Sequence, residues 1–227
     1  HRVTRSAAQR DGAPPMMRCC VLAAAALTVA AHVLEALPLA CDAFGASWRP
    51  VCAAVADNAV HGAVGFLVAG AGSYAAVGAV RPRTAAACAL CACLVDADHF
   101  LAARSPRLSA ATSLRRRPPA HAATFLVAAV ALAFALGRGR AAALVFAAVG
   151  SHHARDALRR GFELGVLGKR TRPLPWAAYV GALHVCALVV GLNAAEARVR
   201  KDRGGDAARR SPLARRFAEA RRAAFDV

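Results

Sequence analysis

The sequence predicts an all-α, multi-pass membrane helical bundle with about six transmembrane helices, or five if the first apolar stretch does not span the bilayer. Hydrophobic residues make up 58% of the 227 residues. The mean hydropathy is +0.40, which is unusually apolar for a water-soluble domain of this size. The apolar residues also gather into separate stretches of about 20 residues, the length that crosses a bilayer as a helix.

The charge and cysteine content exclude two other classes. The chain has 30 Lys and Arg against 13 Asp and Glu, which we interpret as basic flanks of membrane helices. Only 6% of the residues are aromatic, too few for a nucleic-acid-binding face with stacking side chains. The expected partner is therefore the lipid bilayer, with no nucleic acid. Cys88 and Cys91 form a CxxC pair, but no second pair completes a zinc site or a disulfide framework.

Six apolar stretches are expected to span the membrane. The first is long for a signal peptide, which is the competing interpretation. The second is rich in glycine and alanine, and such small residues let helix backbones approach closely. In the last, Pro175 can start a helix, and Trp176 and Tyr179 suit the membrane interface. The stretches are residues 19–41, 58–80, 84–103, 120–136, 141–158 and 173–195.

These stretches predict one membrane domain between two polar ends. Residues 1–15 are polar and patternless, and we interpret them as a non-native or disordered leader. Residues 16–196 form the helical membrane domain. Residues 197–227 form a basic tail of the cytosolic type, expected to be a frayed helix or disordered. With six spans, both ends of the membrane domain lie on one face of the bilayer.

Histidines and acids gather at the ends of four of these stretches. When six segments alternate in direction, all four ends lie on one membrane face. Side chains four apart share a helix face, as His152 and Asp156 do. Because charge at the bilayer centre costs about 2.5–3.5 kcal/mol per group, these groups need partners, and a shared divalent cation would supply one. The residues are Asp57, His61, Asp96, Asp98, His99, His121, His152, His153 and Asp156.

Each polar residue also has a simpler interpretation. Asp57 can cap the second helix, and His99 or His121 alone is typical of an interfacial histidine. Arg155 and Arg159 are expected to extend toward lipid headgroups. Three residues outside the clusters are interpreted as packing or lipid-interface residues: His32, Glu35 and His184.

Several motifs resemble a known family of membrane proteins. The stretches DNAVHG, DADHFLAARS, RRPPAH, SHHARDALRRG and GKRTRPLPWAAYV are similar to those of the transmembrane protein 267 family. The resemblance covers most of residues 57–181 and extends to the final Asp226 and Val227. It implies a multi-pass membrane protein.

A more distant resemblance is to the bacterial YdjM-like membrane proteins, a group labelled as metal-dependent hydrolases. It is carried by His61 near the start of a helix, an Asp-x-Asp-His motif ending at His99, and a Ser-His-x-x-x-Asp motif beginning at Ser151. Arg116 stands where that group has a histidine, which removes one potential ligand and adds a fixed cation.

If the site is active, the resemblance implies a metal-dependent hydrolase that holds zinc or another divalent metal. Asp96 would accept a proton, and Arg117 would hold the oxyanion of a lipid-like ester or phosphoester. Asp57 and His153 would support the site. The implied metal ligands are His61, Asp98, His99, His121, His152 and Asp156.

Two alternatives remain open at this point. The chain can be a non-enzymatic structural or interaction protein whose Asp–His and Asp–Arg pairs lock the helix ends, which the departure at Arg116 favours. It can also be a metal or proton transporter. The polar groups gather at one face and do not form a path across the bilayer, which argues against transport.

Overall fold

The structure is a computed structural model that describes residues 15–36, 48–165 and 169–210. Within these ranges the chain is helical, and only isolated β-bridges join Glu163 to Ala122 and to Arg170. The predicted all-α membrane fold is confirmed. The expected leader, apart from Pro15, and the end of the tail lie outside the described residues. The elements are α1 (Pro15–Ala36), α2 (Arg49–Val77), α3 (Pro82–Leu94), α4 (Ala97–Ala103), α5 (Leu108–Thr112), η3 (Pro119–His121), α6 (Ala123–Ala135), α7 (Gly139–Arg160) and α8 (Trp176–Arg210).

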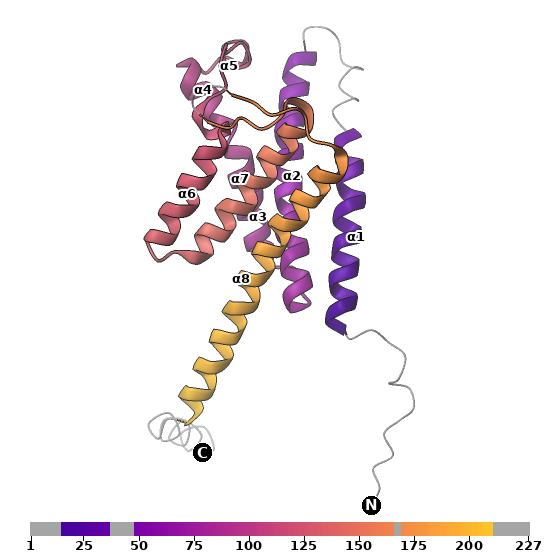
Figure 1. The fold of residues 1–227 in the computed structure, drawn as a ribbon, viewed down its shortest axis with the longest axis vertical. Coiled ribbons are helices and arrows are strands. Elements are labelled where there is room, and N and C mark those ends of the chain that lie inside the picture. The colour runs from indigo at the N-terminus through magenta and orange to yellow at the C-terminus, as the bar shows by residue number, and fades with distance from the viewer. Residues whose placement is uncertain (1–14, 37–47, 166–168, 211–227) are drawn as a thin grey trace, which may run out of the picture.

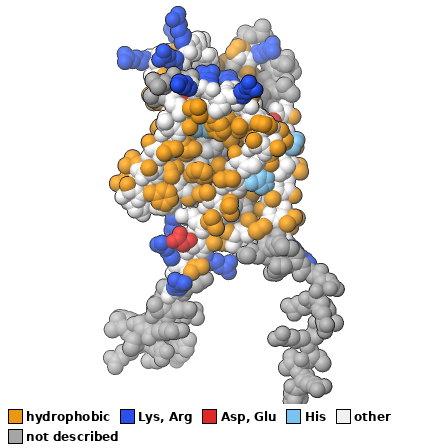
Figure 2. Space-filling model, viewed as in Figure 1, with side chains coloured by type: hydrophobic (Ala, Val, Ile, Leu, Met, Phe, Trp, Pro, Cys, Tyr) orange, Lys and Arg blue, Asp and Glu red, His pale blue; other side chains and the backbone are white. Residues whose placement is uncertain are grey.

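Among the described residues, four helical segments are long and apolar enough to cross a membrane: Arg18–Ala36, Arg49–Val77, Pro82–Ala103 and Trp176–Lys201. The space-filling view shows an apolar band between two ends that carry basic side chains (Figure 2). Helix α6 is apolar but has 13 residues, which is about 20 Å of helix against a hydrocarbon core of about 30 Å. Helix α7 has 22 residues, but its second half is polar. The full count of six spans stays a prediction.

Helix α2 forms the centre of the bundle. It packs against α1, α3, α7 and α8, and α7 in turn contacts α3, α6 and α8. Val64, Val68 and Leu183 are buried where these helices meet. At Gly72, an added Cβ would lie 2.1 Å from the backbone oxygen of Ala187. The small residues of the second span therefore allow the close approach of α2 and α8 that the sequence indicates.

Several element boundaries differ from the predicted ones. Helix α2 begins at Arg49, so Asp57 lies two turns inside it, and the interpretation of Asp57 as a helix cap is wrong. The third stretch is two helices, because α3 ends at Leu94 and α4 begins after a turn at Val95 and Asp96. Helix α8 continues past the predicted boundary at residue 195 to Arg210, so the first part of the basic tail is helical.

The ends of the bundle are distinct. Helix α1 begins and α8 ends at the lower end in Figure 1, whereas α4 and α5 lie at the upper end. This placement agrees with the expected position of both ends of the membrane domain on one face.

Candidate metal centre

The polar end of α7 lies inside the bundle. Residues 151–157 of this helix are all buried, because α2, α3 and α8 pack around them. His152 and Asp156 lie one turn apart and point in the same direction. The SHHARD segment therefore faces protein and not lipid, which makes its charge tolerable within an apolar bundle.

Two interruptions of helical structure bring further side chains to α7. Asp96 occupies the turn between α3 and α4. His121 ends the short 3-10 helix η3, which follows Pro118 and begins at Pro119. The carboxylate of Asp98 accepts the backbone N–H of Ala120 at 2.9 Å. This hydrogen bond holds η3 against α4 and fixes the position of the His121 ring.

The ligand-type atoms of the cluster lie close together. His121 Nε2 and His152 Nε2 are 3.3 Å apart. Asp156 Oδ2 lies 3.7 Å from each of these nitrogens, and Asp96 Oδ1 lies 3.2 Å from His121 Nε2 and 3.6 Å from His152 Nε2. Ligand-type atoms from the predicted ends of the third, fourth and fifth apolar stretches thus lie within one small volume.

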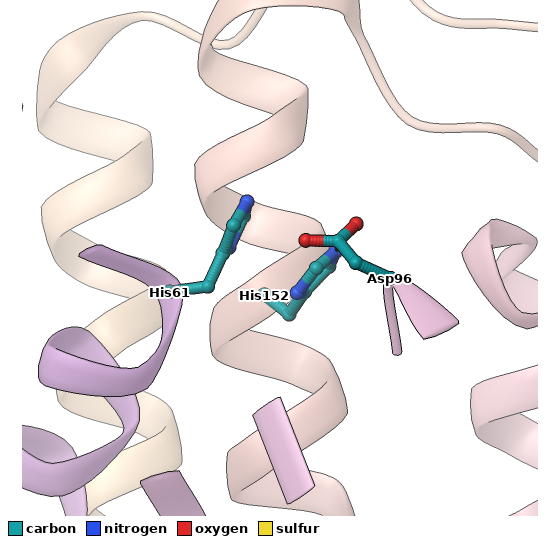
Figure 3. A group of neighbouring side chains, drawn as sticks. All are labelled: His61, Asp96 and His152. Carbon is teal, nitrogen blue, oxygen red and sulfur yellow. The ribbon is translucent and has the colours of Figure 1, made fainter. Parts of the chain in front are cut away.

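The fourth helix end contributes His61 from α2. Figure 3 shows His61, Asp96 and His152 converging from α2, the α3–α4 turn and α7, and each offers a ligand atom within 4.8 Å of the others. The His61 ring stacks on His152 with centroids 3.7 Å apart. His61 is only 1% exposed, yet neither ring nitrogen has a hydrogen-bond partner among the described residues. Buried, unpaired ring nitrogens are unusual in a folded protein.

The two central histidines have partners on their second ring nitrogens. His152 Nδ1 is 3.0 Å from the backbone oxygen of Ala92. His121 Nδ1 lies 3.3 Å from Asp98 Oδ1, although the pair does not meet hydrogen-bond geometry. Metal-ligating histidines usually have a carbonyl or carboxylate at this second nitrogen, which orients the ring.

The other predicted site residues lie around this centre. His99 can join a group with Asp96 and His121, and its Nδ1 is 3.2 Å from the backbone oxygen of Ala111. His153 is buried beside the centre, where its Nε2 lies 2.8 Å from the backbone oxygen of Ala120. Among the described residues, His153 belongs to none of the candidate ligand groups.

The ring of His121 has an altered proton affinity. Burial opposes a charge on this ring, but the contact of the ring with Asp96 and the negative charges of Asp98 and Asp156 outweigh it and raise the pKa of His121 to about 9. Without a bound cation, His121 is therefore protonated at neutral pH and compensates part of the carboxylate charge.

Arg117 neutralises another part of this charge. Its Nη2 lies 2.7 Å from Asp156 Oδ2, and its side chain is 10% exposed. Its Nε has no hydrogen-bond partner in the described part of the chain. The arginine therefore contacts the centre directly while retaining one unused donor.

A buried ion-pair network adjoins the centre, and the sequence interpretation missed it. Arg155 is 0% exposed and donates to Glu35 Oε1 at 2.8 Å and to Asp57 Oδ1 at 2.6 Å. The Tyr179 hydroxyl also donates to Glu35. The interpretations of Arg155 as extending toward headgroups, of Glu35 as a residue without a cluster and of Tyr179 as interfacial are wrong. An acid within the first apolar stretch was the available signal, since such a group needs a buried partner.

The remaining histidines, His32 and His184, lie outside the centre, where the sequence interpretation assigns them packing or lipid-interface roles. His32 contacts the Trp176 ring at a centroid distance of 4.2 Å. His184 Nδ1 is 2.7 Å from the backbone oxygen of Val180 on its own helix, and its Nε2 is 3.3 Å from the backbone oxygen of Ala24 on α1.

Apolar helices of membrane-spanning length, with histidine and aspartate side chains gathered at one end, define an integral, multi-pass membrane protein. The chain belongs to the transmembrane protein 267 family. It is 34% identical to transmembrane protein 267 of Xenopus laevis over 156 residues, which cover 62% of this chain and 70% of that relative. It is 33% identical to the Mus musculus protein over the same shares of both chains, and 33% identical to the Bos taurus protein over 60% of this chain and 68% of the relative. No family model and no solved structure matches the chain.

Proposed function

We propose that this protein binds zinc or a similar divalent metal in the His/Asp centre. One observation carries the proposal. The atoms His121 Nε2, His152 Nε2 and Asp156 Oδ2 form a triangle with sides of 3.3, 3.7 and 3.7 Å. Tetrahedral zinc with bonds of about 2.0–2.1 Å separates neighbouring ligand atoms by about 3.3 Å. The three side chains are therefore close to a ligand arrangement before any cation is added.

The surrounding donors support the same assignment. His121, His152 and Asp156 are buried, whereas Asp96 is 27% exposed. Catalytic zinc sites typically use three protein ligands and keep one exchangeable position. The unpaired nitrogens of His61 supply a further donor. We assign Asp98 the role of positioning His121, since it lies at the other nitrogen of that ring.

The reaction class that fits this centre is hydrolysis of a lipid-like ester or phosphoester. A divalent ion there would supply Lewis acidity and lower the pKa of bound water. Asp96 is placed on the accessible side of the centre and would accept a proton from water. Arg117 would hold an oxyanion through its guanidinium group, which already lies against Asp156 at the centre. The order of aspartates and histidines, which resembles that of YdjM-like proteins, supports hydrolysis as the reaction class.

Metal binding is tested by elemental analysis of the protein purified in detergent. We expect about one metal ion per chain, and we expect His152→Gln to lose at least 90% of it. His153→Gln is the matched control, because His153 is the adjacent buried histidine outside the candidate ligand groups. The proposal would be contradicted if wild-type protein holds no metal after incubation with zinc. It would also be contradicted if both variants lose the same amount of metal.

Hydrolysis is tested separately on metal-loaded protein with a fluorogenic ester and a fluorogenic phosphodiester. We expect turnover of one substrate class and a drop of about 100-fold in Arg117→Gln, the typical effect of removing one oxyanion donor. Arg116→Gln changes the adjacent, exposed arginine and should keep full activity. Turnover that is unchanged in Arg117→Gln at full metal content would exclude the assigned role of Arg117.

A second candidate function is a structural lock without metal. The observation that favours it is that the carboxylates already have cationic partners, since Arg117 pairs with Asp156 and Arg155 pairs with Glu35 and Asp57. This function predicts that zinc leaves the thermal unfolding temperature unchanged. The metal centre predicts a clear rise with zinc, because a ligand that binds only the folded state stabilises it.

A further inference from the structure

A second polar feature lies at the other end of the bundle from the metal centre. A cleft of about 360 Å³ opens between the start of α3, the start of α7 and the middle of α8. The metal centre lies at the opposite ends of α3 and α7. The 13 residues of α3 alone separate the two features by about 20 Å.

The walls of this cleft combine basic and apolar side chains. Arg81, Arg83 and Arg140 line it, and no Asp or Glu of the described residues does so. Leu144 and Val190 form part of the apolar wall, and Val190 lies within a candidate membrane span. Three cations therefore face one small volume that continues into the apolar part of the bundle.

The helix ends add to this positive potential. The N-caps of α3 and α7 make no side-chain capping hydrogen bond, and neither helix has an acid in its first turn. The N-terminus of a helix carries a partial positive charge and presents unpaired backbone N–H groups. Two such ends beside three arginines form a strong anion-binding environment.

The position of the cleft indicates where the anion comes from. Basic side chains lie directly below the apolar band at the lower end of the molecule in Figure 2. A phosphate at this level belongs to the lipid headgroup layer, and the apolar wall beside it suits the start of an acyl chain. A free phosphate would gain nothing from that wall.

We propose that the cleft lined by Arg81, Arg83 and Arg140 binds the headgroup phosphate of an anionic phospholipid. The arginines contact the phosphate oxygens, and Leu144 and Val190 contact the glycerol and upper acyl region. The bound lipid joins α3, α7 and α8 at the face opposite the metal centre.

Native mass spectrometry of the full chain in detergent tests this proposal with phosphatidylglycerol and phosphatidylcholine as probes. We expect one phosphatidylglycerol to remain bound at energies that remove phosphatidylcholine. The triple variant R81Q/R83Q/R140Q should lose at least tenfold in phosphatidylglycerol affinity. The matched control is R104Q/R107Q/R115Q, which removes the same charge from exposed arginines at the other end of the bundle.

Three outcomes would overturn the proposal. The first is equal retention of the two lipids by wild-type protein. The second is an equal loss in both triple variants, which indicates an effect of net charge only. The third is displacement of phosphatidylglycerol by inorganic phosphate at similar concentration, which identifies a free anion as the ligand. The lipid site is supported if R104Q/R107Q/R115Q retains phosphatidylglycerol, R81Q/R83Q/R140Q loses it, and inorganic phosphate does not displace it.

Discussion

At the scale of single residues, the buried charges of α7 are tolerated because other segments of the chain supply their partners. Asp156 on α7 meets Arg117 from the segment before η3. Arg155, one position earlier, meets Glu35 on α1 and Asp57 on α2. Adjacent residues of one helix thus pair with different segments of the chain, since successive side chains point about 100° apart.

Arg155 is the residue whose loss should destabilise the protein most strongly. Arg155→Gln leaves the carboxylates of Glu35 and Asp57 without their buried cation, and breaking a buried ion pair typically costs about 3–5 kcal/mol. The free energy of unfolding, measured by chemical unfolding in detergent, should fall by this amount.

Arg159 provides the control for Arg155. It also pairs with Asp57, but its side chain is 36% exposed, and such pairs contribute about 0–1 kcal/mol. Arg159→Gln should therefore change stability little. Neutralising the partners as well, in R155Q/E35Q/D57N, should recover part of the loss, and a triple variant less stable than R155Q would contradict the assigned ion-pair network.

At the scale of elements, breaks between helices place the side chains of the metal centre, and small residues allow α2 and α8 to pack closely. Asp96 reaches the centre because α3 stops at Leu94. His121 reaches it because η3 begins at Pro119 and the extended backbone of Ala122 separates η3 from α6. Continuous helices through these segments would carry both side chains to other faces of the bundle. The close contact of α2 and α8 at Gly72 and Gly191 then sets the spacing of the helices beside the centre.

Gly72 is the clearest test of this helix contact. In Gly72→Leu, the new Cβ would lie 2.1 Å from the Ala187 backbone oxygen, so α2 and α8 must separate. Overpacking of this kind costs about 1–3 kcal/mol, and more where backbone must move. The measurement is the thermal unfolding temperature of the purified protein, which should fall by several degrees.

Gly181→Leu is the matched control on α8. Gly181 has open space where a Cβ would be placed, and replacing glycine in a helix gains about 0.5–1 kcal/mol of helix propensity. We expect unchanged or slightly raised stability. Equal destabilisation by the two variants would show that added side-chain volume at any position, and not the α2–α8 contact, is responsible.

At the scale of the whole molecule, the fold class and the meeting of four polar helix ends follow from the sequence. Apolar stretches of bilayer length mark the helices, and their alternating direction places His61, Asp96, His121 and His152 at one end. The partners of Arg155 do not follow from it, because Glu35 lies 120 residues away in the chain and its pairing depends on how α1 packs against α2 and α8. The start of α2 at Arg49 was also missed, because Arg49, Pro50 and Asp57 interrupt the apolar pattern of the preceding residues.

The arrangement of the whole bundle makes one further prediction, that the metal centre and the arginine cleft open on opposite sides of the membrane. Arg18 near the start of α1 and Lys201 near the end of α8 lie at the end of the bundle that holds the cleft, whereas Thr112 on α5 lies at the end that holds the metal centre. All three side chains are exposed. Each position can therefore carry a single cysteine in a background whose native cysteines are alanine.

In sealed vesicles of uniform orientation, a membrane-impermeant maleimide should label Arg18→Cys and Lys201→Cys together, or Thr112→Cys alone. Detergent should then make all three positions reactive, which controls for local reactivity. Labelling of Thr112→Cys from the same side as Lys201→Cys would mean that the bundle does not cross the bilayer along its long axis. The histidines, the carboxylates and the three arginines would then face one compartment, and the separation of a metal centre from a lipid site on the opposite face would fail.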